Sequence, residues 1–428
     1  MAKQTVAIIG LGYVGLPLAC LCARRGMKVY GFDIDEAIVK ATNSGKSHIA
    51  DASLAKQVKS LKGKIIATAN PKEALADADI IVVCVPTPID ENKLPDLKPL
   101  EGACKSIAQH IRKGQLIIIE STIYPGTVRE IVRPILEKSG LISEKDFYLA
   151  HCPERIDPGN KKWILENIPR VLGGLGEKGT KIAEKFYKSI LKSNVLVLSS
   201  IECAEAVKVV ENTFRDVNIA FVNELAKSFD KLGIDVLEVI KGAGTKPFGY
   251  MPFYPGPGVG GHCISVDPYY LIERAKQKGF EHEFLMLARK INDSMAEHVV
   301  SLAESALAQI NKNLQNSSIA LLGLAYKADV DDMRESPALH ILQLLKSKGA
   351  NPKVFDLHII EKSNVPSLDD AIKNADCIIL ATHHKEFVSA LTAKKLKSMN
   401  VKAIIDARNC LDKEAIAAAG IIYKGIGH

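Results

Sequence analysis

A glycine-rich turn directly after the first apolar segment limits what this chain can fold into. Residues Val6–Ile9 form a short apolar run. Gly10, Gly12 and Gly15 follow it with the spacing G-x-G-x-x-G and open a helical pattern. In a βαβ unit the first glycine permits a tight turn, the second lets a pyrophosphate approach the backbone, and the third lets helix and strand pack closely. The turn therefore predicts a parallel, doubly wound sheet with a phosphate site at the first helix N-terminus.

Asp33 ends the next apolar run and distinguishes between two dinucleotides. Its carboxylate can accept hydrogen bonds from the adenosine ribose hydroxyls and would repel a 2′-phosphate, so we expect NAD rather than NADP. Tyr13 and Val14, inside the glycine turn, belong to the same expected site. Two later strands end next to short polar segments, and the carboxyl ends of such strands form the ligand crevice. The expected cofactor residues there are Val85, Thr87, Ser121 and Thr122.

Short apolar runs alternate with amphipathic helical segments in the first third of the chain, which is typical of buried parallel strands. The expected strands are Val6–Ile9, Val29–Phe32, Ile65–Ala67, Ile80–Val85, Leu116–Glu120 and Tyr148–Ala150. The alternation returns at Ile319, where Ile-Ala-Leu-Leu-Gly-Leu-Ala-Tyr repeats the form of the first turn without counterparts of Gly12 and Gly15. Because a pyrophosphate then has no close approach, we expect this second domain to serve another substrate.

One helical pattern extends from Ile201 to Leu232 without glycine or proline, with apolar positions three and four residues apart. A helix of this length is expected to join domains. Its broad apolar surface also favours contact with a second subunit, so we expect a homodimer or a higher homo-oligomer. The predicted fold class is α/β, with two Rossmann-like doubly wound domains joined by this long central helix.

Charge and composition exclude several classes of partner. A formal net charge of +7, without a basic stripe, is no signature of nucleic-acid binding. We find no apolar run of about 18 residues, so no membrane span is expected. The nine cysteines have no paired C-x-x-C spacing, which favours thiols in a reducing, cytoplasmic compartment. His383 and His384 are adjacent and point apart, so we expect no metal site.

The glycine-rich loop before Cys263 is the second informative feature of the sequence. Its glycines allow tight folding and offer backbone amides to an anion. Asp267 follows Cys263 by four residues, so both side chains share one face if a helix starts at the cysteine, and the helix N-terminus would then lower the thiol pKa. A lone cysteine is otherwise a small buried hydrophobe, which we expect of the other eight. We predict that Cys263 is a nucleophile.

Five ordered motifs, spread over essentially the whole chain, resemble the UDP-glucose/GDP-mannose dehydrogenase family. They are the glycine turn at Gly10, Pro153-Glu-Arg155, Lys208-x-x-x-Asn212, Gly260-Gly-His-Cys263-x-x-Val-Asp267-Pro and Asp332-Met-Arg-Glu-Ser336. The resemblance implies an NAD-dependent, four-electron oxidation of the C6 hydroxymethyl group of a nucleotide sugar to a carboxylate. The reaction would pass through a thiohemiacetal and a thioester at Cys263.

The resemblance also implies roles for the other catalytic candidates. Lys208 would stabilise the oxyanion of each tetrahedral adduct, and Asn212 would help to hold substrate and water. Glu154 would act as general base, or as its water relay, in hydrolysis. Asp267 would hold the catalytic water or Lys208, and Thr122 would contact substrate or water. The alternative for Lys208 and Asn212 is a solvated helix face.

Further contacts follow from the same resemblance. Arg334 would reach NAD, and the remaining substrate-binding residues would be Arg155, Tyr254, Gly258, Gly260, Tyr326, Lys327 and Arg408, in addition to Glu154, Lys208 and Asn212. A guanidinium suits bidentate contact with phosphate. The alternative for Glu154 and Arg155 is a surface ion pair with each other.

Two segments favour one class of sugar. Pro158-Gly-Asn160 and Lys246–Gly258 look like the branch of the family that acts on UDP-N-acetylhexosamines, with UDP-N-acetylglucosamine as our first expectation and UDP-N-acetylmannosamine or UDP-glucose as alternatives. UDP-glucose-specific members carry a glutamate where this chain has Pro158. The domains would be residues 1–200 for NAD, 201–310 for dimerisation and the catalytic cysteine, and 311–428 for the nucleotide sugar.

Two competing hypotheses share parts of this pattern. A two-electron dehydrogenase of the 3-hydroxyacid type would have the same N-terminal fold but would need no thiol. A non-catalytic nucleotide-sugar sensor would bind NAD and a UDP-sugar without producing NADH. The role of Cys263 separates the first hypothesis from our prediction, and NADH production separates the second.

Overall fold

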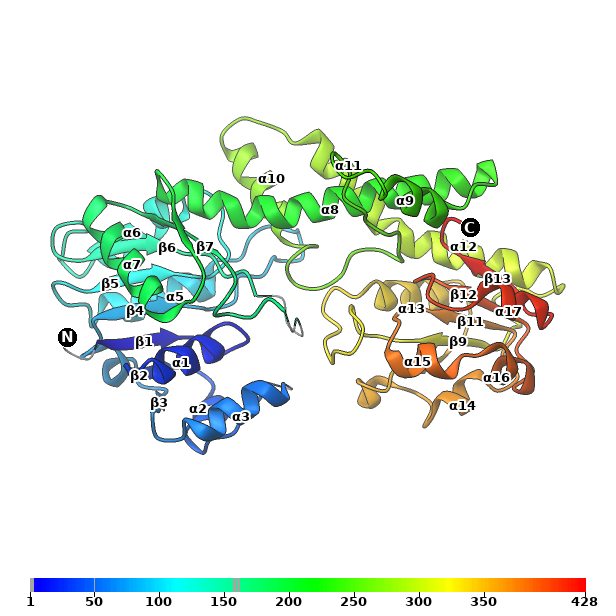
Figure 1. Cartoon of the computed structure of the whole chain (residues 1–428), viewed down its shortest axis with the longest axis horizontal. Coiled ribbons are helices and arrows are strands. Elements are labelled where there is room, and N and C mark those ends of the chain that lie inside the picture. Colours follow the sequence, from blue (N-terminus) through cyan, green and yellow to red (C-terminus); the bar gives the residue numbers. More distant parts are fainter. Residues whose placement is uncertain (1–3, 50, 157–159, 161) are drawn as a thin grey trace. The chain divides into compact units, whose positions relative to one another are not determined.

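The computed structural model describes residues 4–49, 51–156, 160 and 162–428. The chain divides into two compact units, whose elements are labelled in Figure 1. The N-terminal unit comprises Met1–Glu211 and Tyr269–Phe280, and the C-terminal unit comprises Asn212–Pro268 and Glu281–His428. Pro158 and its neighbour Gly159, which carry part of the sugar prediction, lie outside the described residues.

An eight-stranded sheet, in the order β3-β2-β1-β4-β5-β6-β7-β8, forms the centre of the N-terminal unit. Its strands pair in parallel except β6 and β7, which are antiparallel. The strands are β1 (Thr5–Ile9), β2 (Lys28–Phe32), β3 (Ile65–Thr68), β4 (Ile80–Val83), β5 (Leu116–Ile119), β6 (Tyr148–His151), β7 (Arg170–Gly174) and β8 (Val195–Val197). This arrangement confirms the predicted doubly wound sheet, and β7 and β8 are additional to the prediction.

The order of the strands places the switch in winding direction between β1 and β4. In open α/β sheets, ligands bind outside the carboxyl ends of the strands at such a point. The sequence placed the end of β4 at Val85, but the strand ends at Val83, which pairs with Ile9. It ends there because β1 turns away at Gly10 and offers no further partner.

Helices flank this sheet, and most of them were expected as amphipathic segments. They are α1 (Gly15–Arg24), α2 (Glu36–Asn43), α3 (Ala52–Ser60), α4 (Pro71–Leu75), α5 (Lys98–Ala108), the π-helical η1 (Val128–Val132), α6 (Arg133–Glu137) and α7 (Glu177–Ile190). Leu16, Leu18 and Leu21 of α1 are fully buried and belong to a core that also includes Val6 and Ile80 from the sheet. The first helix is therefore fixed in place by the core beneath it.

The long helix α8 (Ile201–Leu232) has the bounds that the sequence predicted. Its residues up to Glu211 belong to the N-terminal unit, and the rest belong to the C-terminal unit. The helix ends where Gly233 adopts a positive φ of 68°, a conformation that glycine provides at helix C-termini. The helix α10 (Asp267–Gln277) also has residues in both units.

The C-terminal unit contains a second, five-stranded parallel sheet in the order β10-β9-β11-β12-β13. Its strands are β9 (Ile319–Leu322), β10 (Lys353–Phe355), β11 (Cys377–Leu380), β12 (Ala403–Asp406) and β13 (Ile422–Gly425). Its helices are α9 (Val236–Ala243), α11 (Glu283–Asp293), α12 (Met295–Ala308), α13 (Pro337–Ser347), the 3-10 helix η2 (Ile360–Lys362), α14 (Leu368–Ile372), α15 (Lys385–Ala390), α16 (Ala393–Ser398) and α17 (Lys413–Ala418). The second Rossmann-like domain is therefore confirmed.

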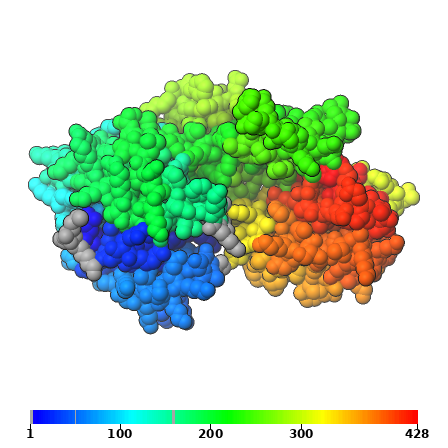
Figure 2. Space-filling view, in the orientation of Figure 1, coloured from blue at the N-terminus to red at the C-terminus, as the bar shows by residue number. Residues whose placement is uncertain are grey.

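The repeated turn of this second sheet has the backbone of the first. Gly323 has φ +87° and Gly10 has φ +85°, each directly after the first strand of its sheet. After β13 the last residues of the chain reach α9, where the Val236 amide donates to the carbonyl oxygen of Gly427 at 2.9 Å (the C-terminal region is red in Figure 2). Within the described residues, no helix is both long and apolar enough to cross a bilayer.

Candidate functional site

The glycine turn of the N-terminal unit has the geometry that a dinucleotide requires. A Cβ on Gly10 would lie 2.8 Å from the carbonyl oxygen of Cys84, and one on Gly15 would lie 1.8 Å from the carbonyl oxygen of Gly10. Gly12 has no atom within 4 Å of its Cβ position, so the space before its backbone is open. No side chain caps the N-terminus of α1. The turn thus leaves room and an uncapped positive helix end for a pyrophosphate.

Asp33 is fixed at the end of β2 and is partly exposed. Its Oδ2 accepts the Leu11 amide at 2.8 Å, and its Oδ1 accepts the Asp35 amide at 3.0 Å. These bonds orient the carboxylate while leaving lone pairs for ribose hydroxyls. Tyr13, inside the turn, is 46% exposed, and Val14 is partly exposed. The residues that the sequence assigned to the adenosine side therefore suit that part of the cofactor.

The loops after β4 and β5 are tied to each other. The Ser121 hydroxyl donates to the carbonyl oxygen of Val85 at 2.7 Å, and this hydrogen bond joins the two loops. The carbonyl oxygen of Thr87 accepts the Tyr270 hydroxyl at 2.9 Å. Thr122, the next residue after Ser121, is partly exposed. The structure thus gives Ser121 a supporting contact and leaves Thr122 accessible.

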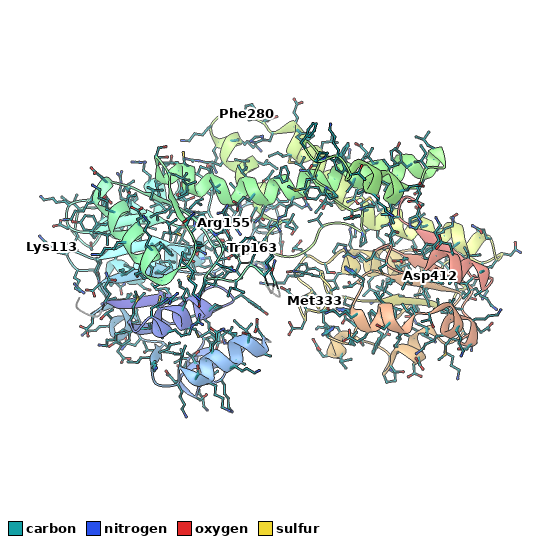
Figure 3. All side chains as sticks on the ribbon, in the orientation of Figure 1. Lys113, Arg155, Trp163, Phe280, Met333 and Asp412 are labelled. Carbon is teal, nitrogen blue, oxygen red and sulfur yellow. The ribbon has the colours of Figure 1, made fainter. Side chains whose placement is uncertain are left out.

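Lys208 does not lie on a solvated helix face. It is only 6% exposed, and its Nζ lies 3.8 Å from Oε2 of Glu154. Arg155 instead pairs with Glu211 and donates to the carbonyl oxygen of Pro169 at 2.7 Å (Arg155 is labelled in Figure 3). The alternative interpretation, a surface ion pair between Glu154 and Arg155, is therefore not the pairing in the structure. A buried ammonium beside a buried carboxylate reduces the cost of desolvating both.

A buried charge cluster behind Thr122 and Glu154 was missed by the sequence analysis. Arg170 Nη2 lies 2.7 Å from Oε2 of Glu120 and donates to the carbonyl oxygen of Cys152 at 3.4 Å. The Tyr187 hydroxyl donates to Oε1 of Glu120. All three side chains are almost completely buried. The available signal was Glu120 itself, a charged residue that directly follows a fully apolar strand.

Glu205 supports the loop after Thr122 from α8, one turn before Lys208. Its carboxylate accepts the amides of Gly126 and Val128, at 2.5 and 2.8 Å. Burial raises the pKa of Glu205 to about 7, although the two amide hydrogen bonds act in the opposite direction. The sequence offered no signal for this contact, because the amide donors lie at the start of η1, an element that no sequence pattern indicated.

In the C-terminal unit, Cys263 lies in a turn rather than at the start of a helix. Its carbonyl oxygen accepts the amides of Val266 at 3.1 Å and Asp267 at 2.8 Å, and α10 begins only at Asp267. The Ser265 hydroxyl donates back to the Gly261 carbonyl, and Gly261, two residues before the cysteine, has φ +84°. The conditional prediction of a helix starting at Cys263 is therefore wrong. The thiol is partly exposed.

Two predicted catalytic residues of this unit are joined directly. The Asn212 amide nitrogen donates to Oδ2 of Asp267 at 2.5 Å, and Arg215 donates to the Asn212 side-chain oxygen. Asn212 is 1% exposed and Asp267 is 3% exposed. Asn212, like Lys208, therefore does not lie on a solvated helix face. The bond fixes the amide orientation, because an ionised carboxylate can only accept.

The glycines of the cysteine loop are required by close packing. A Cβ on Gly260 would lie 2.9 Å from Cβ of Tyr326, and one on Gly261 would lie 2.7 Å from the Tyr326 ring. The Gly261 amide donates to the carbonyl oxygen of Arg334 at 3.0 Å. Gly258 has φ +131° and faces Pro337 at 3.3 Å. The loop glycines are thus in contact with Tyr326 and Arg334, two other predicted site residues. Tyr254, which was also predicted to bind substrate, is 61% exposed.

Arg408 is held beside the same loop. Its Nε donates to the carbonyl oxygen of Ala381 at 2.8 Å, and its Nη1 lies 3.2 Å from the Cβ position of Gly256. Burial lowers the pKa of Arg408 to about 10, so the guanidinium stays charged at neutral pH. Lys327 is exposed, and the Arg334 side chain makes a bidentate contact with Asp332.

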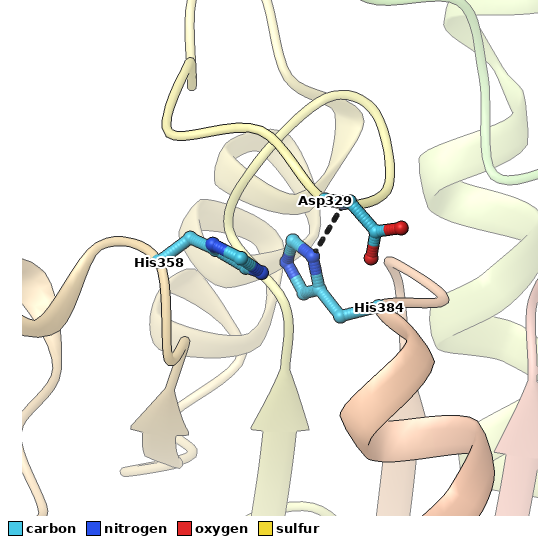
Figure 4. A group of neighbouring side chains, drawn as sticks. All are labelled: Asp329, His358 and His384. Carbon is cyan, nitrogen blue, oxygen red and sulfur yellow. Dashed lines mark hydrogen bonds between the residues drawn. The ribbon is translucent and has the colours of Figure 1, made fainter. Parts of the chain in front are cut away.

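A group of possible metal ligands, Asp329, His358 and His384, lies in the C-terminal unit (Figure 4). Nδ1 of His384 accepts the Asp329 amide at 2.9 Å, so the ring proton is on Nε2, which lies 3.1 Å from Oδ2 of Asp356. Both ring nitrogens of His384 are therefore engaged, and neither offers a lone pair to an ion.

Asp356 occupies the position in the second sheet that Asp33 occupies in the first. It accepts the amides of Leu324 at 2.6 Å and Ala325 at 3.0 Å, in addition to the contact with His384. Burial opposes ionisation, but these hydrogen bonds lower the pKa of Asp356 to about 2. Unlike Asp33, this carboxylate is completely buried. The second turn is thus closed by its own residues.

Comparison with known proteins gives matches along the whole chain. Models of the UDP-glucose/GDP-mannose dehydrogenase family match residues 4–191 (NAD binding domain), 202–294 (central domain) and 320–413 (UDP binding domain). The chain is 38% identical to a UDP-N-acetyl-D-mannosamine dehydrogenase of Pyrococcus horikoshii, over 99% of each chain. It is 37% identical to a UDP-N-acetyl-D-glucosamine 6-dehydrogenase of Pseudomonas aeruginosa, over 96% of each. A solved structure of a UDP-D-ManNAc dehydrogenase from Pyrococcus horikoshii aligns with a TM-score of 0.92 at 37% identity, covering 99% of both chains.

Proposed function

Because the chain belongs to the UDP-glucose/GDP-mannose dehydrogenase family and is an NAD-dependent UDP-sugar dehydrogenase, we propose a specific reaction for it. It oxidises the C6 hydroxymethyl group of a UDP-N-acetylhexosamine to a carboxylate through a covalent intermediate at Cys263. The observation that carries this proposal is the buried hydrogen bond between Asn212 and Asp267, next to the turn of Cys263. Buried polar side chains beside a partly exposed thiol are the setting of a reactive cysteine.

NAD fits the N-terminal unit on three observations. Gly12 leaves open space, α1 presents an uncapped N-terminus, and Asp33 keeps an accessible carboxylate. NAD⁺ would supply the hydride acceptor here, one molecule for each of the two oxidation steps. Residues of the turn would hold the pyrophosphate, and Asp33 would hold the ribose hydroxyls.

Cys263 divides the four-electron oxidation into manageable steps. Its thiolate adds to the C6 aldehyde, forming a carbon–sulfur bond and an oxyanion that takes up a proton. The second oxidation restores the carbonyl group and leaves a thioester. Water then adds to the thioester carbonyl, the carbon–sulfur bond breaks, and the carboxylate leaves as the thiol is regenerated.

The charged residues suit the steps around the thiol. The Lys208 ammonium would stabilise each oxyanion, because a positive charge in a buried setting acts strongly on a developing negative charge. Glu154, close to Lys208, would accept the proton of the attacking water. Asp267 and Asn212, oriented by the hydrogen bond between them, would hold that water with their remaining polar atoms.

The C-terminal unit matches the family's UDP binding domain, and its cations would bind the nucleotide. Arg408 is charged, held by two backbone carbonyls, and adjacent to the cysteine loop. Tyr326 and exposed Lys327 complete the proposed contacts. Two relatives named for UDP-N-acetyl sugars, which differ only in configuration at C2, support the class of sugar. We also propose a division of the chain into three segments: residues 1–200 bind NAD, residues 201–310 carry dimerisation and the catalytic cysteine, and residues 311–428 bind the nucleotide sugar.

A side-by-side assay tests the substrate class. We expect kcat/KM for UDP-N-acetylmannosamine or UDP-N-acetylglucosamine to exceed that for UDP-glucose by roughly tenfold or more, because a site that pairs with an N-acetyl group is left unsatisfied without it. NADH absorbance should rise by two equivalents per sugar consumed. Preference for UDP-glucose would contradict the substrate class, and absence of NADH with every sugar would favour a nucleotide-sugar sensor.

Homodimerisation is the second part of the proposal. Phe214 and Phe221 on α8, and Phe284 and Leu287 on α11, are each about half exposed or more, at 48, 52, 66 and 52%. Covering such side chains stabilises an association by roughly 25 cal/mol per Å² of apolar surface. The residues lie within the central segment that the sequence assigned to dimerisation.

We expect a solution mass of twice the 46.5 kDa of one chain, by light scattering after size exclusion. Phe221→Glu should shift the protein toward the monomer, because burying a carboxylate in an apolar contact is costly. The matched control is Ile360→Glu, at an exposed apolar residue (55%) of the same unit outside both helices. A monomeric wild-type protein at micromolar concentration would contradict the proposal.

A further inference from the structure

A row of buried polar side chains lies beneath the start of the cysteine loop, within the C-terminal unit. The Gly256 amide donates to the side-chain oxygen of Asn223 at 2.9 Å. The Asn223 side-chain nitrogen donates to the Asn292 oxygen at 2.9 Å, and the Asn292 nitrogen donates to Oδ1 of Asp216 at 2.8 Å. Arg289 donates to the same Oδ1 at 2.5 Å. We call these four side chains the amide relay; none is more than 4% exposed.

The amide relay has a fixed direction. The Gly256 amide can only donate and the Asp216 carboxylate can only accept, so both asparagine amides must point the same way. Each bond then polarises the next, and a path of this kind acts as one unit rather than as separate contacts. Reversing one amide would set an oxygen against the Asp216 carboxylate.

Buried polar groups of this kind cost stability compared with apolar packing of the same shape. What a directional hydrogen-bonded path provides instead is one defined arrangement. Here it joins α8, which carries Asn223 and Asp216, to α11, which carries Asn292 and Arg289. The network also fixes the position of the backbone at Gly256, which lies seven residues before Cys263.

The loop meets the same helix at a second point. A Cβ on Gly258 would lie 3.1 Å from the carbonyl oxygen of Asn292, and one on Gly260 would lie 2.7 Å from the carbonyl oxygen of Glu335. The loop therefore has little freedom to adjust if Gly256 moves. Any displacement at its start is passed along the tight glycine segment toward the thiol.

We propose that Asn223 and Asn292 are positioning residues that hold the cysteine loop in its reactive conformation, oriented by Asp216 and Arg289. The inference rests on the proposed role of Cys263 and adds the side chains that act through the loop rather than on the substrate. It assigns these two amides a role in setting thiol reactivity.

Asn223→Asp tests the proposal with almost no change in shape. The new oxygen faces the Asn292 oxygen, so the relay breaks. We expect the rate of Cys263 alkylation by iodoacetamide, followed by peptide mass spectrometry, to change at least roughly threefold, and kcat to fall roughly tenfold or more. The KM for NAD should stay constant, because the glycine turn belongs to the N-terminal unit. Asn218→Asp, the same change at a less buried position of α8, should match the wild type.

A double variant separates positioning from general damage. With Asp216→Asn added to Asn223→Asp, both amides can reverse, so that the bonds linking Gly256, residue 223, Asn292 and residue 216 can form again with the charge now at the Gly256 end. The bonds from Arg289 to residue 216 and from Asn292 to the carbonyl oxygen of residue 216 are lost, while Arg289 keeps its bond to Asp293. We expect the double variant to recover part of the alkylation behaviour and kcat lost in Asn223→Asp. Asp216→Asn alone should keep alkylation close to that of the wild type, because its amide oxygen can still accept from Asn292, but it should lower the melting temperature, because buried Arg289 loses a charged partner.

The outcomes distinguish the two levels of the proposal. Wild-type alkylation and kcat in Asn223→Asp, or additive losses in the double variant, would overturn the positioning role. If Asn223→Asp fails to fold, the folded double variant still decides, because recovery of alkylation behaviour in it is expected only if the reversed asparagines hold Gly256 again. Changed alkylation in a protein that oxidises no UDP-sugar would retain the positioning role and reject the proposed function.

Discussion

Replacing Cys263 by serine is expected to lower kcat for conversion of the sugar to its carboxylate by a factor on the order of 10³ or more. The hydroxyl has nearly the shape of the thiol, but it is a far weaker nucleophile toward the aldehyde, and no adjacent base is assigned to activate it. NADH absorbance measures the loss, and isothermal titration should show unchanged affinity for NAD⁺, whose proposed site lies in the N-terminal unit.

Cys203→Ser is the matched control, because Cys203 is the exposed cysteine in the first turn of α8. It should keep wild-type kcat and melting temperature. Full turnover by Cys263→Ser would reject the thioester mechanism and support a two-electron dehydrogenase that needs no thiol. Mass spectrometry of the wild type under turnover should find the covalent adduct on the peptide that contains Cys263.

Replacing Arg170 by methionine is expected to destabilise the N-terminal unit by roughly 3–5 kcal/mol. The substitution keeps much of the volume but leaves the Glu120 carboxylate buried without its guanidinium, since the two lie 2.7 Å apart and are both about 1% exposed. Urea denaturation can be followed through Trp163, the single tryptophan of the chain, which belongs to the N-terminal unit.

Removing both charges should be milder than removing one. In Glu120→Gln with Arg170→Met no unpaired charge remains, so the double variant should be more stable than Arg170→Met alone. Arg129→Met is the control: its partner Glu202 is 32% exposed and Arg129 is 45% exposed, so the free energy of unfolding should change by less than about 1 kcal/mol. Equal effects of Arg170→Met and Arg129→Met would contradict the argument.

Local patterns predicted the parts of the fold whose causes are local. The glycine turn appeared as expected because positive φ at Gly10 and the open space at Gly12 follow from the residue type. The bounds of α8 were exact because an uninterrupted apolar spacing ends at Gly233. By contrast, β7 and β8 were missed: β7 contains two glycines, and β8 has only three residues.

The candidate site shows the same division. Motif resemblance named Asn212 and Asp267, but their hydrogen bond joins residues 55 positions apart and depends on tertiary packing. Arg170 and Glu120 are 50 positions apart, and neither position alone signals a buried ion pair. The condition that a helix starts at Cys263 is not met: a turn closed by the Val266 amide and the Cys263 carbonyl precedes α10, and residue spacing alone does not reveal such a turn. Sequence patterns named the candidate residues, whereas packing decided their partners.

The closed second turn has a consequence for anyone who would redesign this protein. Sheet, turn and strand-end aspartate are duplicated, yet in the second copy His384 and two amides occupy the Asp356 carboxylate. Adding the two missing glycines would therefore not be enough to create a second dinucleotide pocket. His384 would also have to be replaced to release the Asp356 carboxylate. The C-terminal unit would then lose a buried hydrogen bond that stabilises it.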